Sequence, residues 1–198
     1  MRLILASTSP TRMAMLEAAG VPFEARPPRV DEQALKEGLR QQGVAPRGLA
    51  DALAEAKAVA LSRREPEALV LGCDQVAVAE DGTLLDKPGS RDGLRAQLEQ
   101  LRGATHKQLS AAVIAERGQP VWRHVDEARL TMRSFSEDFL DSYVDAEGEA
   151  SAGCVGGYRI EAVGVQLFSR IEGSHFTILG MPLLPLLDYL RTRAVIAT

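Results

Sequence analysis

A short apolar run, residues 69–73, restricts the fold of this chain more than any other feature. Each of its residues is apolar or glycine, and Asp74 follows at once. A strand that is apolar on both faces belongs inside a sheet that helices cover on both sides. Ligands of such α/β sheets collect at the carboxyl ends of the strands. The run therefore predicts a buried strand that ends in Asp74, at a position that favours chemistry over packing.

A strand followed by a helix is also expected at the start of the chain. Leu3–Ala6 has the pattern of a short buried strand, and Pro10–Ala19 that of a helix, which Gly20 stops. Ser9 is a typical N-cap, and Pro10 suits the first helical position. The turn Ser7–Ser9 should therefore present unpaired backbone N–H groups and the positive end of a helix dipole, which favour an anion.

The rest of the chain alternates between helical and extended patterns. Helices are expected at 49–63, 94–101, 137–146 and 182–191, half-buried strands at 109–113, 121–125 and 163–167, and a hairpin turn at 80–82. No repeat or linker interrupts these elements. The sequence therefore predicts a single mixed α/β domain over residues 1–198, with a twisted mixed sheet flanked by helices.

Composition excludes several classes of function. The net charge of the 198 residues is -4, and no basic run is dense enough for a nucleic-acid polymer. No apolar stretch has the length of a membrane span, and Leu3–Ala6 is too short for a signal peptide, so we expect a soluble, cytoplasmic protein. Cys73 and Cys154 lack the spacing of a zinc site or of a disulfide framework.

Three groups of polar residues are not explained by the expected helices and strands. They are the turn Ser7–Arg12, the acids Asp31, Glu32 and Asp74, and the lysines Lys57 and Lys87. A helix N-terminus, an arginine and two lysines suit phosphate oxygens, while carboxylates bind a divalent cation and activate water. Each feature alone has an ordinary explanation, as a helix cap or a solvated charge. Together they suit a metal-bound triphosphate.

Several motifs resemble, in order and over almost the whole chain, those of Maf proteins. They are LILASTSPTR, VDE at 30–32, AEAKA at 54–58, GCDQV at 72–76, DKP at 86–88, LRGATH at 101–106, and the later GYRIEA and GMPLLPLL. The resemblance implies a mixed α/β fold related to the inosine triphosphate pyrophosphatases, with a nucleotide cleft across the sheet, and a homodimer. It also implies hydrolysis of a nucleoside triphosphate to a monophosphate and pyrophosphate with Mg²⁺, Mn²⁺ or Co²⁺.

The same resemblance implies roles for individual residues. Asp74 is expected to be the proton acceptor, and Glu32, with Asp31 beside it, to hold the metal together with Asp74. Lys87 is expected both to assist catalysis and to bind substrate. The other substrate-binding residues implied are Ser7, Ser9, Arg12 and Lys57.

Three positions bear on the nucleobase. Thr11, Gln75 and Glu161 stand where members resembling dTTP and UTP pyrophosphatases have Arg, Thr and Gln, and where members resembling 7-methyl-GTP pyrophosphatases have Trp, Gln and Glu. Two of the three agree with the second group, and a carboxylate at 161 can accept hydrogen bonds from guanine. We therefore expect a guanine-type or modified nucleotide to be preferred over dTTP and UTP, although Thr11 cannot stack on a cationic base.

Other interpretations remain open. A nucleotide-binding regulator of septum formation, with little catalysis, is the alternative to an enzyme. A kinase or a dinucleotide-dependent oxidoreductase would need glycine fingerprints that are missing, since Gly153, Gly156 and Gly157 match neither pattern. Those glycines are expected to permit a tight bend beside the site. His106 is expected to be a hydrogen-bonded structural residue, because no nucleophile or metal triad accompanies it.

Overall fold

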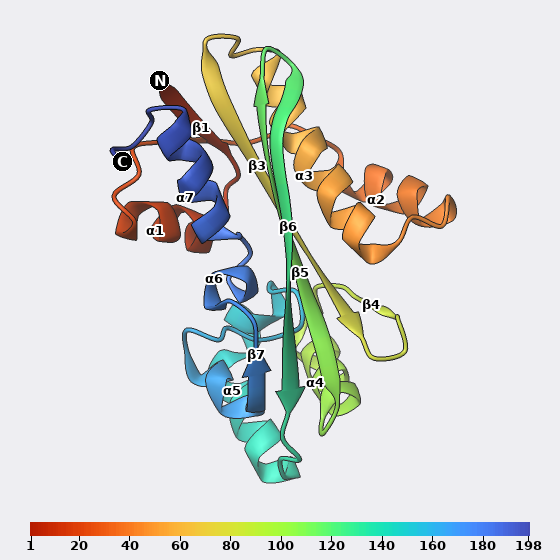
Figure 1. The fold of residues 1–198 in the computed structure, drawn as a ribbon. Helices are drawn as coiled ribbons and strands as arrows, with labels where there is room; N and C mark the ends of the chain where they lie inside the picture. Colours follow the sequence, from red (N-terminus) through yellow and green to blue (C-terminus); the bar gives the residue numbers. More distant parts are fainter. The chain divides into compact units, whose positions relative to one another are not determined.

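The computed structural model describes residues 1–198, and one mixed sheet is its frame (Figure 1). The strand order is β2-β1-β3-β5-β6-β7, and β4 pairs with β3. β1 pairs in parallel with β2 and β3, whereas β3–β4 and β6–β7 are antiparallel. The strands are β1 (Arg2–Ala6), β2 (Glu24–Arg26), β3 (Ala68–Ala79), β4 (Leu84–Leu85), β5 (Thr105–Glu116), β6 (Gln119–Met132) and β7 (Phe168–Glu172). This mixed sheet, flanked by helices, confirms the predicted fold class.

Seven α-helices and one 3-10 helix accompany these strands. They are α1 (Pro10–Ala18), α2 (Glu32–Gln41), α3 (Pro46–Ser62), α4 (Arg91–Leu101), α5 (Glu137–Ala152), the 3-10 helix η1 (Val163–Leu167), α6 (His175–Ile178) and α7 (Leu183–Thr192). The five helices and the 80–82 turn expected from the sequence are present, with ends displaced by a few residues. No helix has both the length and the apolar character needed to cross a bilayer.

The chain forms two compact units that share strands. Unit 1 contains 1–75, 109–126 and 175–198, and unit 2 contains 76–108 and 127–174. The strands β3, β5 and β6 each contribute residues to both units. The prediction of one domain over residues 1–198 stays a prediction.

In unit 1, both faces of the central strands are buried. Leu69 and Leu71 of β3 pack in a large cluster with residues of α1 and α7, whereas Val70 packs with Leu61 of α3 on the opposite face. The ribbon accordingly has α7 on one side of β3 and α3 on the other (Figure 1). A continuous apolar run is what a strand covered on both faces needs, so this part of the sequence prediction is confirmed.

Two of the strand predictions are wrong, and the first concerns the end of β3. β3 does not end at Asp74 but continues to Ala79, because 76–78 are again largely buried and Ala77 pairs with Leu85 of β4. Its parallel pairing with β1, however, reaches only Leu71. Asp74 therefore lies inside its own strand and just past the end of the parallel ladder with β1.

Residues 163–167 form the 3-10 helix η1, not the expected strand. The apparent alternation was misleading, because Val163 and Val165 are exposed while Gly164 and Leu167 are buried. A spacing of three between buried residues fits a 3-10 helix, in which residues i and i+3 lie on the same side.

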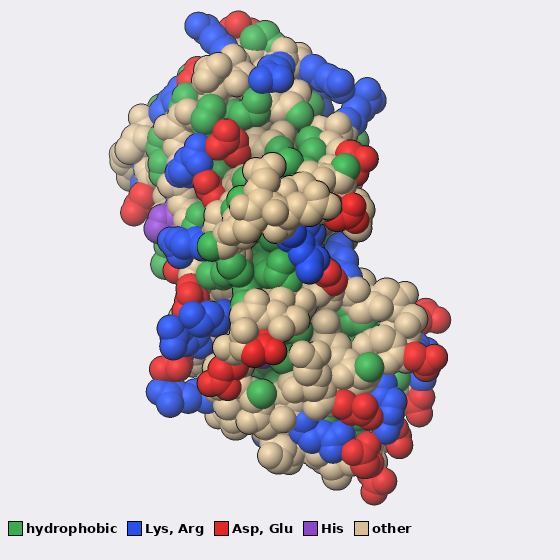
Figure 2. Space-filling view, turned by 90° about the vertical axis from the view of Figure 1, so that its right-hand side faces the viewer, with side chains coloured by type: hydrophobic (Ala, Val, Ile, Leu, Met, Phe, Trp, Pro, Cys, Tyr) green, Lys and Arg blue, Asp and Glu red, His purple; other side chains and the backbone are tan.

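In unit 2, α4 and α5 pack against each other and are also joined by ion pairs. Leu94, Leu98 and Leu101 form the buried side of α4. On the outer side, Arg95 and Arg102 both pair with Glu137 of α5. Acidic and basic side chains are interspersed over the face that Figure 2 shows, without a continuous basic field.

Candidate functional site

A buried ion pair joins α3 to β3. Lys57 Nζ lies 2.6 Å from Asp74 Oδ1, and the two side chains are 6% and 11% exposed. Gly72 makes this approach possible, because a Cβ there would lie 2.2 Å from the carbonyl oxygen of Ala54 and 2.7 Å from the amide nitrogen of Ala58. The helix backbone therefore rests directly on the strand, and Lys57, between those two residues on α3, reaches Asp74.

The ammonium group of Lys57 has a second carboxylate beside it. Glu32 Oε2 lies 2.8 Å from Lys57 Nζ, although the Glu32 side chain is half exposed. Asp31 has a different task, since its side chain accepts a hydrogen bond from the Ala34 amide and caps α2. The structure thus brings Glu32 and Asp74 to one lysine, and it assigns Asp31 a capping contact.

The turn between β1 and α1 is built as expected. Ser9 caps α1 by accepting a hydrogen bond from the Arg12 amide at 3.4 Å, and the Ser9 amide donates to Ser7 Oγ at 3.1 Å. Pro10 occupies the first helical position. Thr11 follows it, half buried, in the first turn of the helix. The turn carries the geometry of a helix N-terminus, which suits an anion.

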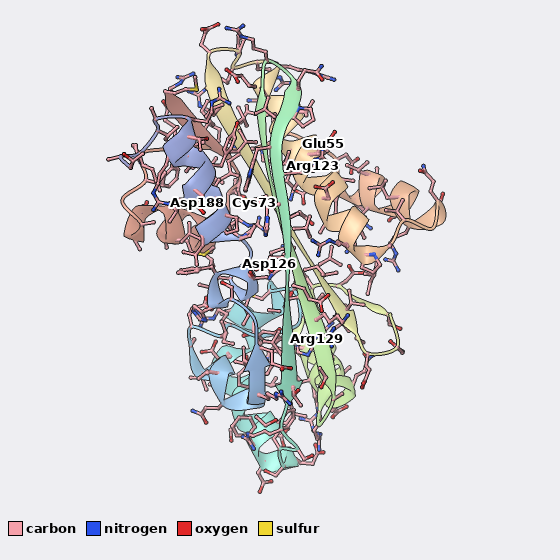
Figure 3. All side chains as sticks on the ribbon, viewed as in Figure 1. Glu55, Cys73, Arg123, Asp126, Arg129 and Asp188 are labelled. Carbon is pink, nitrogen blue, oxygen red and sulfur yellow. The ribbon has the colours of Figure 1, made fainter.

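The pKa of the Cys73 thiol reports the charges near this part of β3. Burial raises the pKa of the Cys73 thiol to about 11, while the positive charges of Arg12 and Lys57 oppose that rise. Both cations therefore act on one point of β3, and the thiol stays protonated and unreactive near neutral pH. Figure 3 shows Cys73 beside α7.

Gln75 contacts the protein backbone. Its Nε2 donates to the carbonyl oxygens of Thr177, at 3.1 Å, and of Ile178, at 2.8 Å. Arg12 Nε donates to the carbonyl oxygen of Gly180 at 2.9 Å. Two residues predicted to bind substrate or to select the base thus also hold the end of α6.

The remaining two predicted residues belong to unit 2. Lys87 and Glu161 are both exposed, and both act on Cys154, whose pKa burial raises. Glu161 raises that pKa further and Lys87 lowers it, so both side chains lie near the same thiol. Arg159, whose charge also lowers the pKa of Cys154, is held by Glu147 through two hydrogen bonds of 3.0 and 2.7 Å.

His106 is a buried structural residue, as expected. It is 1% exposed, and its Nε2 lies 2.7 Å from the Tyr158 hydroxyl. Burial lowers the pKa of His106 to about 4, so the ring is neutral at physiological pH. Gly156 and Gly157 form the expected bend, with φ of 87° and 77°, and Tyr158 follows them directly.

A set of polar residues around α6 was not expected from the sequence. Ser110 and Thr177 are fully buried, and Thr177 Oγ1 donates to Asp126 Oδ2 at 2.6 Å. The only sequence signal was a serine and a threonine within apolar surroundings, which does not reveal a partner distant in the chain.

The carboxylates fit a divalent cation. Glu32 and Asp74 supply hard oxygen donors within 2.8 Å of one lysine nitrogen, so the two groups are neighbours. No group of three or more His, Cys, Asp or Glu side chains is placed to hold a metal. Mg²⁺ is commonly bound by one or two carboxylates together with substrate phosphates and water, so this donor set suits a metal that arrives with a triphosphate.

Comparison with known proteins decides the family. The family described as Maf-like protein matches residues 2–193. The chain therefore belongs to the Maf family. Among its relatives, a Ruegeria pomeroyi protein is 52% identical over 196 residues, which is 99% of this chain and 98% of that protein. A Caulobacter vibrioides protein is 53% identical over 187 residues, 94% of this chain and 93% of the relative. Both Maf relatives are named nucleoside triphosphate pyrophosphatase.

Proposed function

We propose that this Maf protein hydrolyses a nucleoside triphosphate to a monophosphate and pyrophosphate. The curated relatives carry that activity in their names, so the predicted enzyme class is confirmed. The observation that carries the proposed site is the buried Lys57–Asp74 pair, placed past the β1–β3 ladder and joined to Glu32. A buried carboxylate paired with a lysine, next to Cys73, on which the charge of Arg12 also acts, is suited to water activation next to phosphate.

Asp74 is the proposed proton acceptor. Lys57 contacts only its Oδ1, which leaves Oδ2 to take the proton of a water molecule. As that water attacks the α-phosphorus, the bond from this phosphorus to the bridging oxygen breaks and pyrophosphate leaves. Arg12 keeps its terminal nitrogens for the phosphate oxygens, because only Nε is used on Gly180. A divalent cation held by Glu32 and Asp74 would lower the pKa of the attacking water and offset phosphate charge.

The first experiment measures product and metal dependence together. The protein is assayed with 7-methyl-GTP, GTP, dTTP, UTP and CTP, with metal removed by chelator and then restored as Mg²⁺, Mn²⁺ or Co²⁺. We expect pyrophosphate, not orthophosphate, and only when metal is present. Orthophosphate as the first product would contradict cleavage between the α- and β-phosphates.

The same panel tests the base. We propose a preference for a guanine-type or modified nucleotide, which Gln75 and Glu161 support. A kcat/KM for dTTP or UTP above that for every guanine nucleotide would overturn this preference.

Asp74→Asn tests the proton acceptor. The amide keeps the size of the side chain but cannot take the proton, so we expect pyrophosphate release to fall at least a hundredfold while nucleotide binding persists. Turnover equal to that of the wild type would refute the assignment. Binding without hydrolysis in the wild type itself would instead favour the regulator of septum formation.

Lys87 is proposed to bind phosphate and to assist catalysis, as the family resemblance implies. A homodimer, which the family resemblance implies, is proposed as well, together with the cytoplasmic location expected from the sequence. Light scattering on the purified protein tests the dimer, since a monomer mass at assay concentration would contradict it.

A further inference from the structure

Two backbone carbonyls at the end of α6 accept hydrogen bonds from the side-chain amide of Gln75. The last carbonyls of any helix lack partners within it, and α6 has only four residues, His175–Ile178. Gln75 Nε2 donates to the carbonyls of Thr177 and Ile178. Because a carbonyl oxygen can only accept, the nitrogen of Gln75 must face α6 and its oxygen must face away.

In this orientation, the amide oxygen of Gln75 is the group that can still bind a ligand. Nε2 donates to two carbonyl oxygens, and none of the hydrogen bonds of the amide uses Oε1. A Cβ on Gly180 would lie 3.6 Å from Oε1 of Gln75 and 3.3 Å from Nη2 of Arg12. The free oxygen thus lies on the side of the proposed phosphate ligand Arg12. An amide oxygen repels phosphate oxygens but accepts a hydrogen bond from a base N–H or a sugar O–H.

Buried hydroxyl groups fix the position of the residue whose carbonyl accepts from Gln75. Ser110 Oγ on β5 donates to the Thr177 carbonyl at 2.6 Å, and the Gly180 amide donates to the same oxygen at 3.1 Å. Thr177 Oγ1 donates to Asp126, which Figure 3 labels on β6. Ser110 and Thr177 are 0% exposed, so neither hydroxyl can replace its partner by bulk water.

We propose that Thr177 and Ser110 are positioning residues, which orient the amide of Gln75 so that it offers the nucleoside a hydrogen-bond acceptor and no donor. The inference rests on the proposed hydrolysis and deepens its substrate recognition. Neither hydroxyl touches the substrate. Their effect reaches it through Gln75, beside the proposed base Asp74.

A double-mutant cycle tests the positioning. Thr177→Val removes the hydroxyl at nearly constant volume, Thr177→Ser keeps it, and Gln75→Met removes the amide. We expect Thr177→Val to raise KM more than it lowers kcat and to reduce the ratio of kcat/KM between the best and poorest nucleotides about tenfold. Thr177→Ser should restore that ratio, and Thr177→Val should have no further effect on it in the Gln75→Met background. An equal effect in both backgrounds would overturn the proposal.

Substrate analogues test the acceptor. Each base N–H or sugar O–H of the best nucleotide is removed in turn. At least one removal should cost the wild type about tenfold in kcat/KM and cost Gln75→Met much less, because it leaves the half-buried amide oxygen of Gln75 without a partner. If no removal behaves in this way, Gln75 does not accept a hydrogen bond from the nucleoside.

A structural readout separates this proposal from the proposed function. In the wild type, the side-chain amide protons of Gln75 should exchange slowly with solvent, and Thr177→Val or Ser110→Ala should speed the exchange. Ser110→Ala serves if Thr177→Val does not fold. If these amide protons exchange equally fast in the wild type and in both variants, the positioning is overturned. If the wild type hydrolyses no nucleotide, the proposed function is overturned, but the exchange result still holds.

Discussion

Lys57 and Asp74 show how much one buried charge depends on its partner. Each lies almost out of solvent, so neither is stabilised by water when the other is removed. Replacing one member of a buried pair commonly costs about 3–5 kcal/mol, since it leaves an uncompensated charge. The second pair, Lys57–Glu32, contributes less because the Glu32 side chain is half exposed.

Lys57→Met is therefore expected to lower the free energy of unfolding by about 3–5 kcal/mol. Urea unfolding measures the change. Adding Asp74→Asn should recover part of that stability, because it removes the unpaired charge, yet the double variant should remain inactive. If stability returned together with activity, the pair would be structural only.

His106 makes the stability depend on pH. Its pKa is lowered from 6.5 to about 4 in the folded protein. Above pH 6.5 neither state binds the proton, so the folded protein has its full stability. As the pH falls below 6.5 the unfolded chain is protonated first, and stability is lost progressively until about pH 4, by about 3 kcal/mol in all.

His106→Gln is the control, because it keeps a polar partner for Tyr158 and does not titrate. Urea unfolding between pH 7 and pH 4 should show a shallower loss in this variant than in the wild type. Parallel pH profiles for the two proteins would contradict the effect of the histidine.

At the scale of elements, the contact between β3 and α3 depends on Gly72. Gly72→Ala should force the helix from the strand, because the added carbon would overlap the backbone of α3. We expect a loss of about 1–3 kcal/mol or more, and a loss of kcat as Lys57 moves from Asp74.

Gly38 provides the matched comparison. It lies within α2, and a Cβ there would meet no atom within 4 Å. Gly38→Ala should therefore raise the stability by about 0.5–1 kcal/mol through helix propensity, with little effect on turnover. Equal effects of the two substitutions in thermal unfolding would show that the close contact at Gly72 is unimportant.

At the scale of the whole molecule, three strands are common to both units. Trp122 of β6, the single tryptophan, stacks on Tyr189 of α7 in unit 1 with ring centroids 5.3 Å apart. If residues 1–198 behave as one domain, tryptophan fluorescence and far-ultraviolet circular dichroism should report the same unfolding midpoint in urea. Two separate midpoints would contradict the prediction of one domain.

Local signals explain why much of the architecture could be predicted. The run 69–73 indicated a strand buried on both faces, and Ser9 with Pro10 indicated the start of α1, because burial and helix capping depend on residues close in sequence. The sequence could not place the end of β3, since its continuation depends on pairing with β4. The expected strand at 163–167 also failed, because a short apolar alternation fits a 3-10 helix equally well.

By itself, the sequence determined the fold class, the family and the identities of the candidate residues, because motifs and hydrophobic periodicity are written along the chain. Only the tertiary structure decided that Lys57 lies between Glu32 and Asp74, and that the amide of Gln75 is committed to the end of α6. Those contacts join residues up to 103 positions apart. Their geometry depends on how helices pack on the sheet, which no local pattern encodes.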